Sequence, residues 1–264
     1  MMKLKTNHVK QRLKEGGVVF GTMLRILKSP DAISLCASED WDYVILDTEH
    51  NDYDHETLSN FSLIAKYEKL ALLVRVPDKL YHQMARVLDL GVEGLVLPQV
   101  KKAEEAEHII RSTKYGPIGQ RGVSKPTNVT LFRNYGNLDY YEWANRENLT
   151  VIQIESMEGV RNIDDIVSVD GIDAIMIGPA DLTMDMGIPG QFNHPKVSEA
   201  YHIIMESCNN HGVAPGIHLQ NLEDVRKWIN AGMRFVTYSY DANFFKEALH
   251  ESLIKLRSMV NGRG

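Results

Sequence analysis

The chain has 264 residues, 44% of them hydrophobic, and a formal net charge of −6, which is typical of one large globular domain or two small ones. An acidic balance without a basic block argues against nucleic acid as a partner. No apolar run approaches the ~18 residues of a membrane span, and the N-terminus lacks the apolar region of a signal peptide. We therefore expect a soluble, cytoplasmic protein with a small ligand, in which Cys36 and Cys208 are free buried thiols.

Short runs rich in β-branched and aliphatic residues recur along the chain. They span residues 18–24, 42–48, 71–77, 93–100, 150–156, 173–179, 213–219 and 234–240. Between most of them lie amphipathic stretches of helical period, several ending on a C-cap glycine. Apolar strands joined by helical crossovers predict a single (β/α)₈ TIM barrel domain over residues 1–264. A doubly wound open sheet is the alternative. It is less favoured because "GTMLRILKSP" after the first strand lacks a glycine-rich phosphate loop.

One long stretch, residues 115–137, interrupts this alternation. It is rich in glycine, proline and asparagine, as in "YGPIGQRGVSKPTNVTLFRNYG". Loops of this length in compact domains are often functional. We therefore expect residues 115–137 to form an active-site loop.

Polar side chains follow the predicted strands at the end where a barrel carries its active site. They are Asp47, Glu49, His50, Arg75, Gln99, Gln153, Glu155 and Asp181. Glu155 and Asp181 end consecutive strands, and two oxygen ligands completed by water suit an octahedral Mg²⁺ or Mn²⁺. Alternatively, each acid caps the following helix or pairs with a surface base.

The segment "GPAD" indicates an anion site. Pro179 suits the first turn of a helix, so the amides of Ala180 and Asp181 would be free to hold a substrate carboxylate. An ordinary strand-to-helix turn is the simpler alternative.

Arg75 lies inside an apolar strand, where a guanidinium must be paired or face a polar cavity. It either pairs with Asp47 or Glu49 or stabilises a developing oxyanion. Asp89 ends a predicted helix, where the dipole disfavours an acid, and His50 is one candidate partner for it. A histidine held by a carboxylate can deprotonate a water.

These segments resemble the HpcH/HpaI aldolases, the class II pyruvate aldolases. The matching segments are "FGTML", "DYVILDTEH", "LLVRVP", "RVLDLGVEGLVLPQV", "YGPIGQRG", "VIQIESMEGVRNIDDIVSVDGIDAIMIGPADLTMDMG" and "HGVAPGI". They fall in order over nearly the whole chain. The resemblance implies a phosphoenolpyruvate/pyruvate-type barrel whose last helix, within residues 241–264, is exchanged between subunits of a hexamer built as a trimer of dimers.

The resemblance also implies a reaction, the reversible cleavage of a 4-hydroxy-2-oxo acid to pyruvate and an aldehyde through a metal-stabilised enolate. It implies Mg²⁺, Mn²⁺ or Co²⁺ on Glu155 and Asp181, and the pyruvyl carboxylate on the amides of Ala180 and Asp181. Further implied roles are Arg75 on the keto oxygen, His50 held by Asp89 for acid–base chemistry through a water, Asp47 in support, Gln153 beside the metal and Ser124 near the substrate. No lysine lies in an apolar strand, so a Schiff-base mechanism is not expected.

The chain departs from the commoner aldolase pattern at Arg25, "NDYD" after His50, Ser124, His218 and Ser239, so the aldehyde is not fixed. A sister branch of the family, found in siderophore gene clusters, condenses oxaloacetate with acetyl-CoA to citrate on the same metal site. We keep this citrate-forming enzyme as the alternative, and a non-catalytic barrel that binds a small carboxylate as a third hypothesis.

Overall fold

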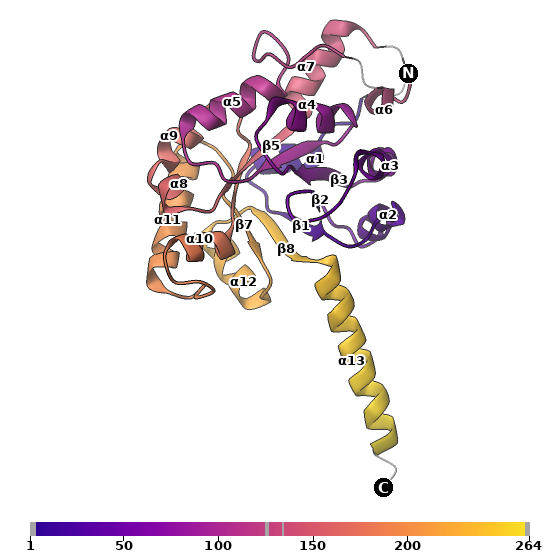
Figure 1. The fold of residues 1–264 in the computed structure, drawn as a ribbon, viewed down its shortest axis with the longest axis vertical. Coiled ribbons are helices and arrows are strands. Elements are labelled where there is room, and N and C mark those ends of the chain that lie inside the picture. Colours follow the sequence, from indigo (N-terminus) through magenta and orange to yellow (C-terminus); the bar gives the residue numbers. More distant parts are fainter. Residues whose placement is uncertain (1–3, 125–126, 134, 262–264) are drawn as a thin grey trace.

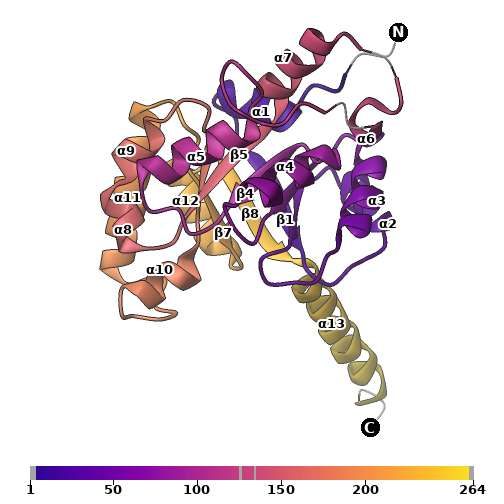
Figure 2. The same cartoon turned by 45° about the horizontal axis from the view of Figure 1, so that its top comes forward.

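The computed structural model describes residues 4–124, 127–133 and 135–261. Its strands form one closed barrel in the order β1-β2-β3-β4-β5-β6-β7-β8, and all neighbouring strands are parallel. Helices surround the barrel (Figures 1 and 2). The predicted (β/α)₈ barrel is confirmed, and the open-sheet alternative is wrong.

Each of the predicted strands is present, and each is shorter than the apolar run that indicated it. The strands are β1 (Val19–Leu24), β2 (Tyr43–Asp47), β3 (Ala71–Arg75), β4 (Gly94–Leu97), β5 (Leu149–Ile154), β6 (Ala174–Ile177), β7 (Gly216–Leu219) and β8 (Phe235–Tyr240). Strands β2 to β6 are buried at every position, because helices cover the outer face while side chains fill the interior.

A cluster of side chains fills the interior of the barrel near the amino-terminal ends of β1, β2 and β8. Tyr43 stacks on Phe235 with ring centroids 4.4 Å apart, and its hydroxyl lies 2.9 Å from the Thr237 hydroxyl. Val19 and Met23 pack in the same cluster. This interior cluster is apolar. The polar side chains gather instead at the carboxyl ends of the strands, which we call the mouth.

The helices complete the outer ring. They are α1 (His8–Lys14), α2 (Asp31–Ser38), α3 (His55–Ala65), α4 (Tyr81–Asp89), α5 (Ala103–Thr113), α6 (Thr127–Thr130), α7 (Asn137–Glu147), α8 (Met157–Arg161), α9 (Ile163–Val167), α10 (Pro179–Asp185), α11 (Pro195–Asn210), α12 (Leu222–Ala231) and α13 (Asp241–Asn261). None of the described helices is long and apolar enough to cross a membrane.

The described part of segment 115–137 contacts α4 and α7. It follows α5 and leads into α7, and the Gly122 amide donates to the hydroxyl of Tyr81, the first residue of α4, at 2.7 Å. The Tyr115 ring packs in a cluster with Tyr140 and Trp143 of α7, and the Tyr115 hydroxyl donates to the Ser124 carbonyl at 3.4 Å. These contacts leave the expected active-site loop a prediction for the described residues, and residues 125–126 and 134 of the segment lie outside them.

Helix α13 projects away from the barrel instead of packing back onto it (Figures 1 and 2). Its exposed apolar side chains are Phe245, Leu249, Leu253, Ile254, Leu256, Met259 and Val260. At its base, an apolar pocket of about 510 Å³ opens between α2 and the first turn of α13, and its lining includes Leu35, Trp41 and Phe244. Water therefore meets two apolar surfaces of the isolated chain.

Candidate active site

The ends of β2 and β3 form one side of the mouth. Asp47 pairs with Arg75 in the strand register, and its carboxylate accepts from Arg75 Nε at 3.0 Å and lies 2.9 Å from Nη2. Asn51 donates to the same carboxylate at 2.7 Å. Burial acts to raise the pKa of Asp47, but the Arg75 hydrogen bond and charge outweigh it, so that this pKa lies below its ordinary value. The expected pairing of Arg75 with an acid is present, and it fixes the guanidinium in the mouth.

Glu49 joins this pair to His50. Its Oε2 lies 3.0 Å from Nη1 of Arg75 and 3.7 Å from Nε2 of His50, whose side chain is 56% exposed. Burial raises the pKa of Glu49, although Arg75 and His50 act to lower it. The imidazole therefore has an acidic neighbour on one side and open solvent on the other.

Asp89 does not hold His50 within the described chain. It ends α4 at the amino-terminal side of the barrel, where its carboxylate pairs with Nη2 of the buried Arg121 at 2.5 Å. A helix that follows β3 carries its last residue away from the mouth of its own chain. The expected role of Asp89 beside His50 stays a prediction.

The ends of β4 and β5 bring a second acid into the mouth. The Glu155 carboxylate accepts from the Gln99 amide at 2.7 Å and from the Gln153 side-chain nitrogen. Burial raises the pKa of Glu155 to about 7, opposed by those two donors and reinforced by the negative charges of Glu49 and Asp181. The structure thus brings Glu155 close enough to both acids for their charges to interact.

Asp181 lies in the first turn of α10, whose first residue is the predicted Pro179. Ala180 and Asp181 are both exposed, and among the described residues their amides have no backbone partner, as expected for a first helical turn. The amides and the Asp181 carboxylate are therefore free for a ligand.

The residues present fit a small divalent cation. The buried Oε1 of Gln153 has no hydrogen-bond partner, which leaves an acceptor beside Glu155. A Cβ at Gly178 would lie 2.7 Å from Glu155 Oε2, so glycine keeps this corner open. Across the described ranges no group of three or more His, Cys, Asp or Glu side chains could hold a metal. A metal here would have two carboxylates, with water or substrate oxygens completing its shell, as Mg²⁺ accepts.

The family model described as HpcH/HpaI aldolase/citrate lyase matches residues 23–248. The chain belongs to this family. Among curated relatives, the 5-keto-4-deoxy-D-glucarate aldolase of Enterobacter sp. (strain 638) is 34% identical over 84% of this chain and 86% of its own. The hydroxypyruvate/pyruvate aldolase of Paraburkholderia phytofirmans is 32% identical over 96% and 98%.

Solved structures agree with this assignment. An HpcH/HpaI aldolase from Desulfitobacterium hafniense DCB-2 superimposes with a TM-score of 0.90 at 32% identity, covering 94% of this chain and 96% of that one. The citrate synthase SbnG has a TM-score of 0.85, also at 32% identity, with 96% and 98% covered. HpcH/HpaI proteins depend on a divalent metal ion, which agrees with the open acidic corner at Glu155.

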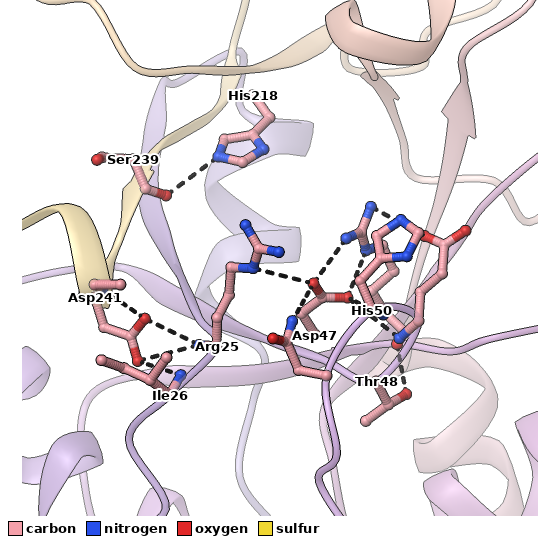
Figure 3. Close-up of polar contacts among 12 residues, drawn as sticks. Arg25, Ile26, Asp47, Thr48, His50, His218, Ser239 and Asp241 are labelled. Atoms are coloured by element: carbon pink, nitrogen blue, oxygen red, sulfur yellow. Dashed lines mark hydrogen bonds and ion pairs between the residues drawn. The ribbon is translucent and has the colours of Figure 1, made fainter.

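The ends of β1, β7 and β8 form the remaining side of the mouth of this HpcH/HpaI chain. Figure 3 shows Arg25 between Asp47 and His218, with Ser239 beyond the imidazole. His218 Nε2 lies 3.2 Å from the Ser239 carbonyl oxygen, and Ser239 has a left-handed φ of 53°. Asp241, which sequence reasoning missed, accepts from the amides of residues 25–27. An acid directly after an apolar strand was the signal that could have found it.

Proposed function

We propose that the protein is a divalent-metal-dependent pyruvate aldolase, which cleaves a 4-hydroxy-2-oxo acid to pyruvate and an aldehyde and catalyses the reverse addition. The observation that carries this proposal is that the same mouth holds two carboxylates, those of Glu155 and Asp181, and the fixed guanidinium of Arg75. Family membership and the named activities of the two curated relatives support the same reaction class.

In this proposal Glu155 and Asp181 hold the metal, Mg²⁺ or Mn²⁺, and the Gln153 oxygen lies beside it. When bound, such an ion polarises the 2-oxo group and spreads the charge that develops there. The amides of Ala180 and Asp181 receive the substrate carboxylate. Each of these groups is an oxygen ligand or a backbone donor, so the site would select a 2-oxo acid rather than a simple ketone.

Arg75 supplies a permanent positive charge for the keto oxygen. Its Nε and Nη2 are held by Asp47 and its Nη1 by Glu49, so it does not have to reorganise as negative charge develops. Cleavage of the C3–C4 bond leaves a pyruvate enolate, whose oxygen Arg75 would face.

His50 would take the C4 hydroxyl proton at an imidazole nitrogen, directly or through a water, and the aldehyde leaves. Its nearest acid is Glu49, so we assign to Glu49 the orienting role first expected of Asp89. Within one chain the Asp89 carboxylate pairs with Arg121 and the Ser124 carbonyl accepts from Tyr115, so we expect Asp89 and Ser124 to act at the site of a neighbouring copy.

We further propose that α13 packs on a second copy of the chain. The apolar stripe through Phe245, Leu249 and Leu253 has no cover of its own, and the pocket lined by Leu35 and Trp41 offers a matching surface. Exchange of α13 between two copies would bury the stripe and the pocket together. Large exposed apolar patches of this kind commonly mark protein–protein interfaces. The hexamer and the cytoplasmic location stay predictions.

The citrate-forming alternative has one observation in its favour, the similarity to the citrate synthase SbnG. That structure is no more identical to this chain than the pyruvate aldolases are, and both reactions use the same oxygen-rich corner. We therefore rank citrate formation second.

A substrate panel separates the two reactions. Pyruvate release from 4-hydroxy-2-oxo acids is measured with added Mg²⁺ or Mn²⁺ and with EDTA. It is measured again with enzyme that has been treated with pyruvate and borohydride and then freed of both. The aldolase predicts release that needs the metal and survives borohydride. Release that survives EDTA or is abolished by borohydride contradicts it, and free CoA from acetyl-CoA plus oxaloacetate would favour citrate formation.

A further inference from the structure

Arg25 is a cation at the mouth that Asp47 does not need as a counter-charge. Asp47 already accepts both Arg75 contacts, the Asn51 amide and two backbone amides. Arg25 Nε lies 3.6 Å from Asp47 Oδ2, which is too long for a hydrogen bond. Its two terminal nitrogens have no hydrogen-bond partner among the described residues, and one third of the side chain is exposed. They are therefore available to a ligand.

The position of Arg25 is built rather than accidental. The Asp241 carboxylate accepts from its backbone amide at 3.1 Å and from the amides of Ile26 and Leu27 at 2.9 Å. The guanidinium carbon lies 4.8 Å above the centre of the Tyr240 ring, a cation–π distance. Backbone and side chain are both held, so little conformational entropy would be lost when an anion binds.

His218 presents an acceptor near Arg25. Burial lowers the pKa of His218 to about 4, opposed by the Ser239 hydrogen bond and reinforced by the charges of Arg75 and Arg25, so the ring is neutral at neutral pH. Because a carbonyl oxygen can only accept, Nε2 carries the proton and donates to Ser239. Nδ1 is then a bare acceptor, and no described residue donates to it. Such an atom suits a substrate hydroxyl.

We propose that Arg25 and His218 form an acceptor subsite that binds the carboxylate and a hydroxyl of a hydroxy-acid aldehyde. Arg25 pairs with the carboxylate, and Nδ1 of His218 accepts from the hydroxyl beside it. The subsite lies on β1 and β7, while the 2-oxo acid is expected at β3, β5 and α10, so the two halves of the substrate would meet near His50. This inference rests on the proposed aldolase function and names the class of its second substrate.

The test compares two aldehydes of nearly equal size. In 2-hydroxy-3-oxopropanoate a carboxylate replaces the CH₂OH group of glyceraldehyde. Addition of pyruvate to each is followed with saturating metal, and the ratio of kcat/KM for the charged over the uncharged aldehyde is recorded. We expect Arg25→Met to lower this ratio about 10- to 100-fold, as loss of a charge-assisted pair does. We expect His218→Leu to lower kcat/KM for glyceraldehyde more than for propanal, because only glyceraldehyde carries the hydroxyl.

Lys28→Met is the matched control. Lys28 lies on the same loop, and its exposed side chain pairs with exposed Asp52 at 3.0 Å, so its loss is expected to leave the ratio within about twofold. A ratio that Arg25→Met leaves unchanged, or changes no more than the control does, overturns the subsite while the aldolase stands. A wild-type protein that joins pyruvate to none of these aldehydes overturns both. A structural defect would lower both rates together and leave the ratio unchanged, so that outcome also counts against the subsite.

Discussion

Arg75→Met is expected to destabilise the fold through a buried charge. The Asp47 side chain is fully buried and that of Arg75 is 10% exposed, so the substitution leaves a carboxylate in the mouth without its main counter-charge. Removing one partner of a buried pair costs about 3–5 kcal/mol. Asn51 and two backbone amides still donate to Asp47. We therefore expect the lower end of this range, about 3 kcal/mol in the free energy of unfolding at pH 7.5.

The stability lost in Arg75→Met depends on pH, and the direction of this dependence can be predicted. The pKa of Asp47 is lowered in the folded wild-type protein, so its contribution is present above the ordinary carboxyl pKa and lost as pH falls through the folded value. Without Arg75, burial would raise this pKa. The variant's deficit is then present at high pH and shrinks as pH falls through the raised value.

Urea unfolding followed by circular dichroism at pH 7.5 and 5.0, at one protein concentration, measures both effects. The control is Arg111→Met, which breaks a pair with Glu107 at 3.5 Å between half-exposed side chains and should cost about 0.5 kcal/mol or less. Equal losses in the two variants, or a deficit for Arg75→Met that does not change with pH, would refute the reasoning.

Three further predictions concern the metal, the proton and the assembly. Glu155→Gln is expected to abolish Mn²⁺ binding in calorimetry, whereas Glu158→Gln, at a partly exposed side chain that pairs with Lys102, should retain it. The Mn²⁺ affinity of the wild-type protein should weaken below about pH 7, where Glu155 takes a proton, and an affinity that does not depend on pH would contradict this. His50→Ala should keep Mn²⁺ affinity and lose about 100-fold or more in kcat, and an intact rate would remove His50 from the mechanism. Leu249→Glu combined with Leu253→Glu should lower the mass found by light scattering, whereas an unchanged mass would show that α13 has no role in assembly.

The barrel could be predicted from the sequence because its strands are buried on both faces. The centres of these runs, such as residues 43–46 and 71–74, are continuously apolar and buried. A covered parallel sheet accommodates eight such strands with helical crossovers. The Asp47–Arg75 pair followed from the same reasoning, since a guanidinium in an apolar strand needs an acid.

The rest of the site depended on distances that spacing along the chain does not contain. Asp241 accepts from the Arg25 amide, although the two residues are 216 positions apart in the sequence. The contact between Glu49 and Arg75 depends on the direction in which the Arg75 side chain points. The roles expected of Asp89 and Ser124 stay predictions for a related reason. A family resemblance assigns a role to a residue, but it does not say which end of the barrel or which copy of the chain delivers that residue.

The most direct test of the central claim needs no aldehyde. Pyruvate is incubated with the protein in D₂O, and loss of the methyl proton signal is followed by NMR, because enolisation at Arg75, Glu155 and Asp181 exchanges those protons. We predict exchange that requires Mg²⁺ or Mn²⁺, stops with EDTA and is lost in Glu155→Gln. Exchange that EDTA leaves unchanged, or the absence of exchange with every divalent metal, would contradict a metal-dependent pyruvate aldolase.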